Sequence, residues 1–435
     1  PDSGRRTAVR SGGSSEPSAT TTTPGGETGQ DAANLVGCAF RAKDAAVRIR
    51  EAPKHFEPFS AFLAAVFVDG HRKNWLLFVE MHLAARGDVW YPRLFPMRVA
   101  LDATPLIEPS GGIRRYVTEL HRALCECFPE DQFCLISDQL QPPASWIERR
   151  WWLIGVQREM ARRGAEIFHG TDFSVPYLPL RPSVMTLHDL SPWRDPAWHG
   201  QAGRVRRRTP FLLRLGLATM IITQSRAIRQ EAMDRFRLPA SRVVVIPLAA
   251  PPQLHRTAPP EGGYFLYVGT LEPRKNLPAL IEAWRLVRRI HPIRLILAGR
   301  KRADGPKIQP EEGLEILGMV GEERLADLYS RALACVYPSL YEGFGLPVLE
   351  AMQCGAAVLA SKDPAISELA QGAAVLIEPG EVRAWAEAMS KAITSPEWAA
   401  DLRRRAVERA REFSWERTAR ATYEVYKEAQ SRFDY

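Results

Sequence analysis

A chain of 435 residues with 46% hydrophobic content can form two or three cores of ordinary domain size, and its longest apolar run, residues 61–68, is too short to span a bilayer. The six cysteines show neither paired zinc-type spacing nor the density of a disulfide scaffold, so free thiols in a cytoplasmic protein are expected. The net charge of +8 favours an anionic partner such as a nucleoside diphosphate or an acidic lipid surface, whereas nucleic acid is disfavoured because no RNA-binding aromatic strand or zinc-finger spacing is present.

The first 96 residues differ in composition from the rest of the chain. Residues 1–34 are rich in Ser, Thr, Gly and Pro with little apolar content, which predicts disorder or a linker. Because the chain begins with proline and a strand is expected directly after Met97, we hypothesise that the native product begins near Met97. The alternative is a small accessory pair of helices over residues 41–93, where apolar clusters occur.

From Met97 onward, short apolar runs alternate with helical patterns, which indicates parallel sheets with helices on both faces. The Pro- and Gly-rich residues 251–263 are expected to link two domains, residues 97–250 and 264–414, whose facing sheet edges form a cleft, with a final helix within residues 415–435. The expected strands are residues 98–103, 132–137, 166–168, 183–187, 220–224 and 243–247 in the first domain, and 264–268, 294–298, 314–317, 334–338, 357–360 and 374–377 in the second.

Two features follow expected strands of the first domain. Gly111 and Gly112 precede a predicted helix over residues 113–125, and their amides would face the cleft, although a plain turn is the more common explanation of such a pair. His188 and Asp189 end an apolar strand, and Asp189 could either orient the imidazole of His188 or bind acceptor hydroxyls. A lone histidine at that position is more often structural than functional.

Residues 203–217 form a basic segment with apolar residues between its arginines. Such a surface could hold a lipid-pyrophosphate acceptor or contact an anionic membrane, with Arg206 and Arg207 among the contacts. The alternative is a solvated helix with one buried face, and we expect Pro210 to interrupt the helical pattern. Nearby, Trp193 and Trp198 suit either a sugar platform or a core.

In the second domain, Arg274 and Lys275 are adjacent cations after a β-compatible run. They are placed to neutralise a diphosphate leaving group, although an Arg-Lys pair is also common on helix surfaces. Cations of this kind provide electrophilic catalysis without a metal, and no D-x-D element is positioned to bind one.

Residues 339–355 read as the end of a strand, a glycine-rich loop and a helix. The amides of Gly345 and Leu346 would point out of the helix N-terminus, where the helix dipole favours phosphate oxygens. Glu342 on the loop and Glu350 on the first helical turn can both accept hydrogen bonds from sugar hydroxyls. Taken singly, Glu350 could merely balance the helix dipole and Glu342 could be a solvated loop residue.

This stretch resembles the E-x7-E signature of the family 4 retaining glycosyltransferases, which have the GT-B architecture of two facing Rossmann-like domains. Residues 264–277, 294–299 and 313–334 resemble segments of that family's C-terminal domain, and residues 98–116 and 184–190 resemble N-terminal elements, so the resemblance covers roughly residues 97–435. It implies that the last helix packs back across the first domain. Two departures are Thr270, where an arginine is common, and Gln371-Gly372, where Gly-Asp is more frequent.

Carried over residue by residue, the resemblance implies catalytic roles for Glu342, His188 and Lys275. It implies no cofactor and no metal, because the nucleoside diphosphate sugar is the donor substrate and the departing phosphate helps to deprotonate the acceptor. The other predicted site residues are Gly112, Gly269, Thr270, Arg274, Gly345, Leu346 and Glu350, with Lys275, for the donor, and Asp189, Arg206 and Arg207 for the acceptor.

The second domain resembles mannosyltransferase-like members of the family, which makes GDP-mannose the first expected donor and a UDP-sugar the second. The acceptor expected from the resemblance is a bacterial surface glycan or its lipid-linked precursor. Two alternatives are a glycogen- or sucrose-type synthase with a soluble acceptor and a non-catalytic protein that binds nucleotide sugars.

Overall fold

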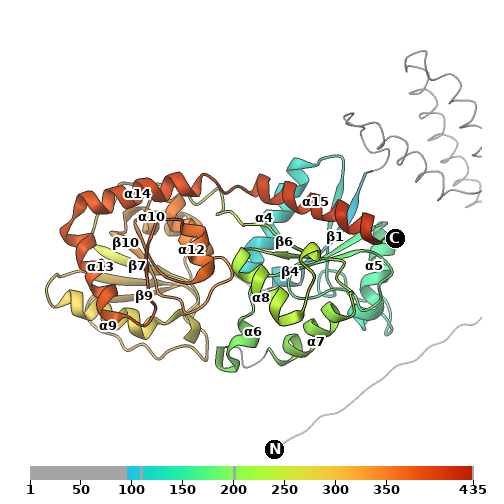
Figure 1. Cartoon of the computed structure of the whole chain (residues 1–435), viewed down its shortest axis with the longest axis horizontal. Coiled ribbons are helices and arrows are strands. Elements are labelled where there is room, and N and C mark those ends of the chain that lie inside the picture. The colour runs from blue at the N-terminus through green and yellow to red at the C-terminus, as the bar shows by residue number, and fades with distance from the viewer. Residues whose placement is uncertain (1–95, 108–110, 199–201, 434–435) are drawn as a thin grey trace, which may run out of the picture. The chain divides into compact units, whose positions relative to one another are not determined.

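A computed structural model describes residues 96–107, 111–198 and 202–433. The hypotheses on residues 1–34 and 41–93 lie outside these ranges. The described part of the chain contains two six-stranded sheets whose neighbouring strands are parallel. The predicted α/β class with two parallel-sheet domains is therefore confirmed (Figure 1).

The first sheet has the strand order β2-β1-β3-β4-β5-β6. β1 pairs with β2 from Arg98 opposite Gln132 to Asp102 opposite Ile136. Each predicted strand is present within two residues at either end, because strands buried on both faces are apolar throughout and stand out from amphipathic helices. The strands are β1 (Arg98–Asp102), β2 (Gln132–Ile136), β3 (Ile167–Gly170), β4 (Ser183–Leu187), β5 (Met220–Thr223) and β6 (Val243–Val245).

The second sheet has the order β12-β11-β10-β7-β8-β9. Its chain direction across the sheet reverses between β7 and β10, as that of the first sheet reverses between β1 and β3. In open α/β sheets, ligands bind outside the carboxyl ends of the strands at such reversals. The strands are β7 (Tyr264–Val268), β8 (Arg294–Ala298), β9 (Leu314–Gly318), β10 (Ala334–Tyr337), β11 (Val358–Ser361) and β12 (Val375–Ile377).

Helices connect the strands and cover both sheets (Figure 1). The α-helices are α4 (Gly112–Cys127), α5 (Val156–Arg163), α6 (Ser191–Arg194), α7 (Gly203–Arg214), α8 (Arg226–Phe236), α9 (Leu277–Arg288), α10 (Glu322–Arg331), α11 (Leu346–Gln353), α12 (Pro364–Ala370), α13 (Val382–Thr394), α14 (Pro396–Ala410) and α15 (Trp415–Phe433). The short helical turns are η2 (Thr104–Ile107), η3 (Trp151–Gly155), η4 (Pro196–Trp198), η5 (Ala240–Arg242) and η6 (Pro273–Lys275).

The last helix, α15, packs on elements of the first sheet, whereas α14 packs on those of the second (Figure 1). On α15, the hydroxyl of Tyr423 donates to Oδ2 of Asp131 at 2.6 Å, and its ring stacks on Phe128. The hydroxyl of Tyr426 lies 2.7 Å from Nδ1 of His169 on β3. The chain thus crosses from the second domain back to the first at its end.

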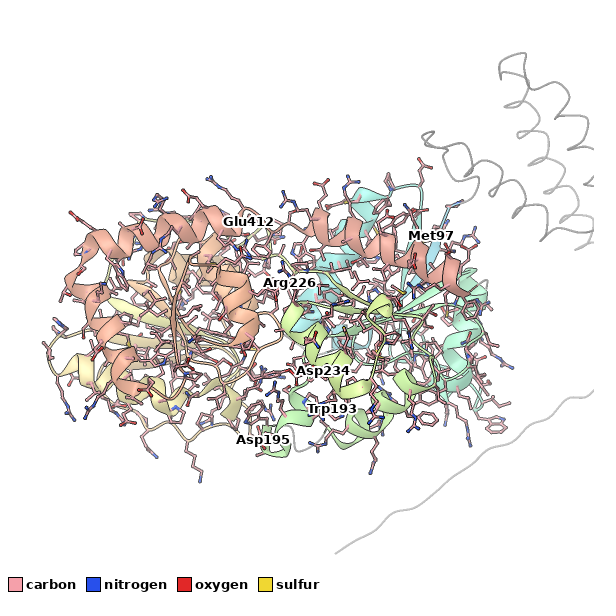
Figure 2. The ribbon with its side chains drawn as sticks, in the orientation of Figure 1. Met97, Trp193, Asp195, Arg226, Asp234 and Glu412 are labelled. Atoms are coloured by element: carbon pink, nitrogen blue, oxygen red, sulfur yellow. The ribbon has the colours of Figure 1, made fainter. Side chains whose placement is uncertain are left out.

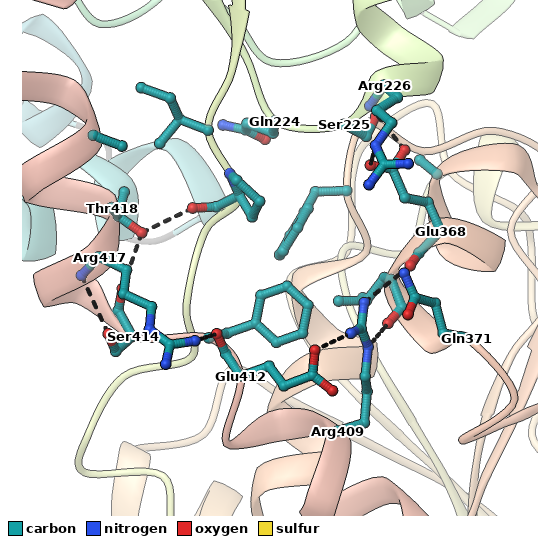
Figure 3. A pocket seen from close by; sticks show the side chains of 17 residues that line it. Gln224, Ser225, Arg226, Glu368, Gln371, Arg409, Glu412, Ser414, Arg417 and Thr418 are labelled. Atoms are coloured by element: carbon teal, nitrogen blue, oxygen red, sulfur yellow. Dashed lines mark hydrogen bonds and ion pairs between the residues drawn. The ribbon is translucent and has the colours of Figure 1, made fainter. Parts of the chain in front are cut away.

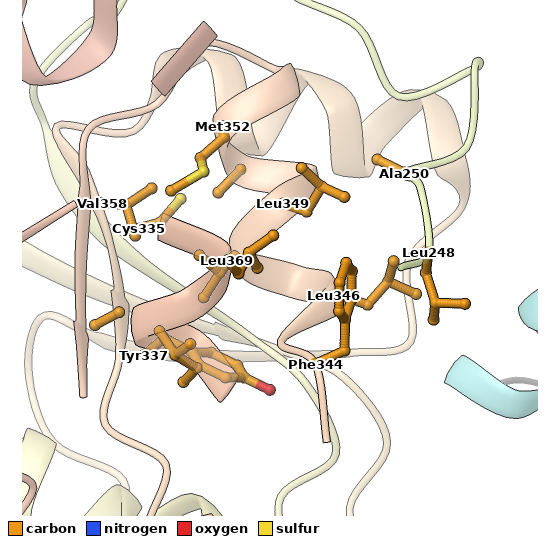
Figure 4. Close-up of a cluster of buried hydrophobic side chains, with 14 of the residues drawn as sticks. Leu248, Ala250, Cys335, Tyr337, Phe344, Leu346, Leu349, Met352, Val358 and Leu369 are labelled. Carbon is orange, nitrogen blue, oxygen red and sulfur yellow. The ribbon is translucent and has the colours of Figure 1, made fainter. Parts of the chain in front are cut away.

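The helix that follows the glycine-rich loop, α11, is buried in the second domain. Its side chains Leu349 and Met352 belong to the same apolar cluster as Tyr337 of β10 (Figure 4). Leu248 and Ala250, which follow β6, belong to this cluster as well. Packing from both domains therefore holds α11 in place.

The structure corrects the expectation for Pro210, because α7 continues through this residue. Proline has no amide hydrogen to donate to the carbonyl four residues earlier. That carbonyl, of Arg206, instead accepts a hydrogen bond of 3.2 Å from the indole nitrogen of Trp193. The side-chain donor replaces the missing helical bond, and the helix is not interrupted.

Candidate active site

Lys275 and Glu342 follow the carboxyl ends of β7 and β10, the two strands at which the second sheet reverses. Nζ of Lys275 lies 2.5 Å from Oε1 of Glu342, and both side chains are buried. The hydroxyl of Tyr337 accepts from Lys275 at 2.9 Å and donates to Glu342 at 3.0 Å. These contacts fix an ion pair at the point where this sheet would bind a ligand.

Arg274 makes a second set of contacts with the same carboxylate. Its Nη1 lies 3.4 Å from Oε2 of Glu342 and 2.6 Å from the carbonyl oxygen of Tyr341, and its Nη2 lies 3.0 Å from Glu272. Nη1 is also 3.9 Å from Oδ2 of Asp189, which follows β4 in the first domain. Arg274 therefore contacts the predicted acceptor residue and the predicted catalytic glutamate together.

The electrostatics of this cluster favour an ionised glutamate. Burial alone would raise the pKa of Glu342, but the charges of Lys275 and Arg274 outweigh it and hold the pKa at about 2. Burial and the neighbouring Arg274 lower the pKa of Lys275, while Glu342 opposes that shift. At neutral pH Glu342 is therefore an anionic hydrogen-bond acceptor flanked by Lys275 and Arg274.

Asp363 fixes the backbone of the glycine-rich loop. Its Oδ2 accepts from the amide of Glu342 at 3.2 Å, and its Oδ1 accepts from Ala365 and Ile366 at 2.8 and 3.1 Å as the N-cap of α12. Burial raises the pKa of Asp363 to about 6. The loop that carries the glutamate is thus tied to the start of a helix.

Tyr341, the residue before this glutamate, projects into the first domain. Its hydroxyl accepts from the amide of Leu190 at 2.9 Å and donates to Oε2 of Glu231 on α8 at 2.9 Å. Its ring stacks with Trp198, and Arg194 lies over the ring. Trp198, for which a sugar platform and a core position were both open, therefore forms part of the contact between the two domains.

Gly343 makes another close approach across the cleft. A Cβ atom at this position would lie 1.8 Å from the carbonyl oxygen of His188, so only glycine fits. The carbonyl of Gly343 also accepts a 2.9 Å hydrogen bond from Oγ of Ser225, the N-cap of α8. These two contacts of Gly343 hold the glycine-rich loop against the end of β4 and the start of α8.

Both ring nitrogens of His188 contact the protein. Nε2 donates to the carbonyl of Thr171 at 2.7 Å, and Nδ1 accepts from the side-chain amide of Gln224. Burial lowers the pKa of His188, so the imidazole is neutral. The predicted catalytic role of His188 stays a prediction. In the structure, the hydrogen bonds of its ring and the contact of its carbonyl with Gly343 fix the end of β4.

Gly345 has a left-handed backbone with φ of 93° and caps α11, which begins at Leu346. Glu350 is consequently the fifth residue of the helix and not in its first turn, which corrects the prediction. Its Oε2 accepts from the hydroxyl of Tyr329 at 3.0 Å, and its Oε1 pairs with Arg115 of α4. Burial raises the pKa of Glu350, although Arg115 partly offsets the effect.

Three side chains at the carboxyl edge of the first sheet escaped the sequence analysis. Asp102 ends β1, Asp172 follows β3, and burial raises the pKa of each to about 6. The positive charge of Arg208 on α7 lowers the pKa of both carboxyls and so opposes part of the effect of burial. Its guanidinium donates a hydrogen bond to the hydroxyl of Ser174. Asp102 lies inside the expected strand 98–103, and Asp172 lies four positions after the expected strand 166–168. A carboxylate near the carboxyl end of an expected strand was the signal that would have identified both aspartates.

The other predicted residues are placed as follows. Arg206 donates to the carbonyl of Pro192 at 3.3 Å, and Arg207 is exposed on α7. Of the arginines on this helix, Arg208 is the one whose charge affects Asp102 and Asp172. Gly112 begins α4, and a Cβ there would meet open space. Gly269 and Thr270 directly follow β7. The predicted roles of these residues stay predictions.

A cavity of about 390 Å3 opens beside the glycine-rich loop but is not lined by Lys275, Arg274 or Glu342 (Figure 3). Phe344 and Phe413 line it, and Arg226 and Glu412 of its wall lie where the two domains meet (Figure 2). Among the described residues, its lining does not include the buried lysine–glutamate pair. In the part of the chain that the structure describes, no group of three or more His, Cys, Asp or Glu side chains is arranged to hold a metal ion.

Two models of known protein families match this chain. A family model described as Glycosyltransferase Family 4 matches residues 129–254, and one described as Glycosyl transferases group 1 matches residues 255–413. Together they cover well over half of the chain. The chain belongs to the group 1, family 4 glycosyltransferases. It is a glycosyltransferase, and the resemblance inferred from its motifs is confirmed.

Curated relatives of this glycosyltransferase include O-antigen chain mannosyltransferase B of Escherichia coli, which is 34% identical over 285 residues, 60% of this chain and 74% of that protein. The MMP alpha-(1->4)-mannosyltransferase of Mycolicibacterium hassiacum is 31% identical over 55% of this chain and 61% of that protein. The serotype-specific mannosyltransferase WbdA of Escherichia coli is 32% identical over 38% of this chain, which corresponds to 21% of its own length.

Solved structures of GT-B glycosyltransferases have the same fold. Sucrose-phosphate synthase from Thermosynechococcus elongatus matches with a TM-score of 0.60 at 22% identity, over 76% of this chain and 98% of that one. Anabaena HepE, solved with UDP and glucose, matches with a TM-score of 0.61 at 18% identity, over 76% of this chain and 99% of that one. At identities this low, the similarity shows a shared fold and nothing more.

Proposed function

We propose that this glycosyltransferase transfers a hexose, mannose from GDP-mannose, to a glycan or lipid-linked acceptor in bacterial surface polysaccharide synthesis. The observation that carries the proposal is the buried cluster of Lys275, Arg274 and Glu342 at the reversal of the second sheet. Similarity to O-antigen chain mannosyltransferase B supports the choice of sugar and of pathway.

In the proposed donor complex, Glu350 accepts hydrogen bonds from the ribose, and the amides at the start of α11 bind the diphosphate. Lys275 and Arg274 exchange part of their contact with Glu342 for phosphate oxygens. Glu342 then accepts hydrogen bonds from hydroxyls of the sugar. The cations stabilise the charge that develops on the leaving group, which is the role of preorganised donors in a buried site.

The acceptor binds to the first domain in this proposal, beside Asp189. Its hydroxyl oxygen forms a bond to the anomeric carbon while the bond from that carbon to the phosphate oxygen breaks and its electron pair leaves with the diphosphate. The departing phosphate takes the proton of the acceptor hydroxyl, and the anomeric configuration is retained. No metal or cofactor takes part in this scheme.

The exposed face of α7 supports a contact with anionic membrane at the cytoplasmic surface. Phe211 and Leu215, 60% and 56% exposed, are one helical turn apart on this helix, and Arg204 and Arg207 are exposed near its start. Apolar and basic side chains on one helix face suit binding at a lipid interface. Among the described residues, no helix is both long enough and apolar enough to cross a membrane.

Two experiments test the proposal. Thermal shift with GDP, UDP, ADP, GDP-mannose and UDP-glucose identifies the donor, because a ligand that binds the folded state raises the midpoint. NMR of the product from GDP-mannose and a lipid-linked acceptor then gives the anomeric configuration, with EDTA included in a parallel reaction. Selective binding of UDP-glucose would contradict the mannosyl donor, an inverted product would contradict retention, and loss of activity in EDTA would contradict the metal-free scheme.

A further inference from the structure

Arg115 lies on α4 in the first domain and reaches the second domain. Its Nη1 forms an ion pair with Glu350, and its Nη2 lies 3.7 Å from Oε1 of Glu322 at the start of α10. Neither the motifs nor the resemblance singled out this arginine. Because the proposed function assigns Glu350 to the donor ribose, Arg115 occupies an oxygen that the donor needs.

The burial of Glu350 makes this pairing consequential. The carboxylate is 2% exposed, and its second oxygen accepts from the hydroxyl of Tyr329. Ribose hydroxyls can replace the hydrogen bond from Arg115, but they carry no charge to compensate a buried anion. Loss of direct contact with Arg115 is therefore costly unless the arginine stays close by and gains another anionic partner.

A position suited to a second anion lies within reach of Arg115, at the start of α11. Glu350 is the fifth residue of α11, so the amides at the start of that helix are only about 6 Å along its axis. The side chain of Arg115 is 24% exposed, and a Cβ at Gly111 or Gly112, four and three positions earlier, would meet open space. A planar guanidinium binds phosphate oxygens as well as it binds a carboxylate.

We propose that Arg115 is a donor-binding residue that exchanges partners. In the empty enzyme it pairs with Glu350; when ribose hydroxyls bind this glutamate, Arg115 turns to the diphosphate at the start of α11. The inference rests on the proposed function, since it requires a nucleoside diphosphate at this site. It follows that Arg115 opposes the binding of a nucleoside and promotes the binding of the corresponding diphosphate.

The test compares two ligands on the full-length protein. Titration calorimetry with GDP and UDP identifies the base, and that diphosphate and its nucleoside are then titrated into the wild type, Arg115→Ala and Arg115→Lys. Arg122→Ala is the matched control, because Arg122 lies on the same helix and pairs with Glu119 and Glu126 of that helix. Circular dichroism and the melting midpoint confirm that each variant is folded.

We expect Arg115→Ala to weaken diphosphate binding roughly 10- to 100-fold, the usual effect of losing a charged hydrogen bond, and to strengthen nucleoside binding a few-fold. Arg115→Lys should lose a smaller part of the diphosphate affinity, because a lysine keeps the charge without the planar fork. Arg122→Ala should change neither affinity.

A merely structural role would move both affinities in the same direction. Equal weakening of the two ligands, or no change in either, therefore overturns the inference while the proposed function stands. If Arg115→Ala does not fold, Arg115→Lys decides, because an unchanged ratio of the two affinities overturns the inference. If the wild type binds neither GDP nor UDP, the proposed donor site itself is wrong and the inference falls with it.

Discussion

The hydroxyl of Tyr341, in the second domain, donates a 2.9 Å hydrogen bond to Oε2 of Glu231, in the first. The same hydroxyl accepts from the amide of Leu190, and the carbonyl of Tyr341 accepts from Arg274 in the cluster with Lys275 and Glu342. One residue thus joins the contact between the domains to the proposed leaving-group site. The packing of the two domains against each other should depend on this hydroxyl.

We expect Tyr341→Phe to lower kcat/KM roughly ten-fold, because it removes two hydrogen bonds of about 1 kcal/mol each and leaves the amide of Leu190 unpaired. Steady-state kinetics with the donor at varied concentration measure the effect. Tyr177→Phe is the control, since Tyr177 is exposed on the first domain. Unchanged kinetics in Tyr341→Phe would contradict a role in domain closure.

Gly343→Ala should abolish most activity with little loss of stability within each domain. The added methyl group would lie 1.8 Å from the carbonyl of His188, so the domains could close only with a shift of backbone. We expect kcat/KM to fall roughly 100-fold, in line with the cost of a 1 Å misplacement at a catalytic site. Gly380→Ala, whose Cβ would meet open space, controls for the loss of glycine. Wild-type rates in Gly343→Ala would show that this approach is not needed.

Lys275→Ala should reduce kcat at least 100-fold, because it removes a preorganised cation from the leaving group. It should also destabilise the fold by about 1.5–3 kcal/mol, since the buried Glu342 keeps Arg274 but loses the hydrogen bond from Lys275. Urea unfolding and rate measurements report the two effects separately. Lys307→Ala, an exposed lysine of the same domain, should change neither quantity.

The low pKa of Glu342 gives this ion pair a defined pH dependence. The pKa lies at about 2, below its ordinary 4.5, so the stability it provides is complete above about pH 4.5 and is lost as the pH falls toward 2. Between pH 5 and 3, the urea midpoint should fall less steeply in Glu342→Gln than in the wild type. Parallel pH profiles would contradict the assignment.

Asp102 should act in the opposite direction. Its side chain is 2% exposed, and burial raises its pKa from 3.8 to about 6, so the stability it provides is complete below pH 3.8 and is lost as the pH rises through 6. Asp102→Asn keeps an oxygen for the hydroxyl of Thr104. We expect this variant to remove about 1 kcal/mol of the stability difference between pH 5 and pH 7.5. The exposed Asp234, changed to Asn, should leave that difference unchanged.

Several elements were predictable because their signals are local. Strand Ser183–Leu187 and strand Tyr264–Val268 were predicted at their observed bounds, since each is a buried apolar run between polar turns. The helix that begins at Leu346 followed from the glycines and the proline around it. Pro210 misled because its missing hydrogen bond is supplied by Trp193, a residue from another helix.

The sequence by itself determined the two parallel sheets, the family and the loop that carries Glu342, because strand periodicity, turn residues and a short motif are properties of neighbouring positions. Only the tertiary structure decided which residues face one another. Arg115 and Glu350 are 235 positions apart, and Tyr341 and Glu231 are 110 apart. Each belongs to an ordinary helix or loop pattern, and packing of the domains brings their charges and hydroxyls together.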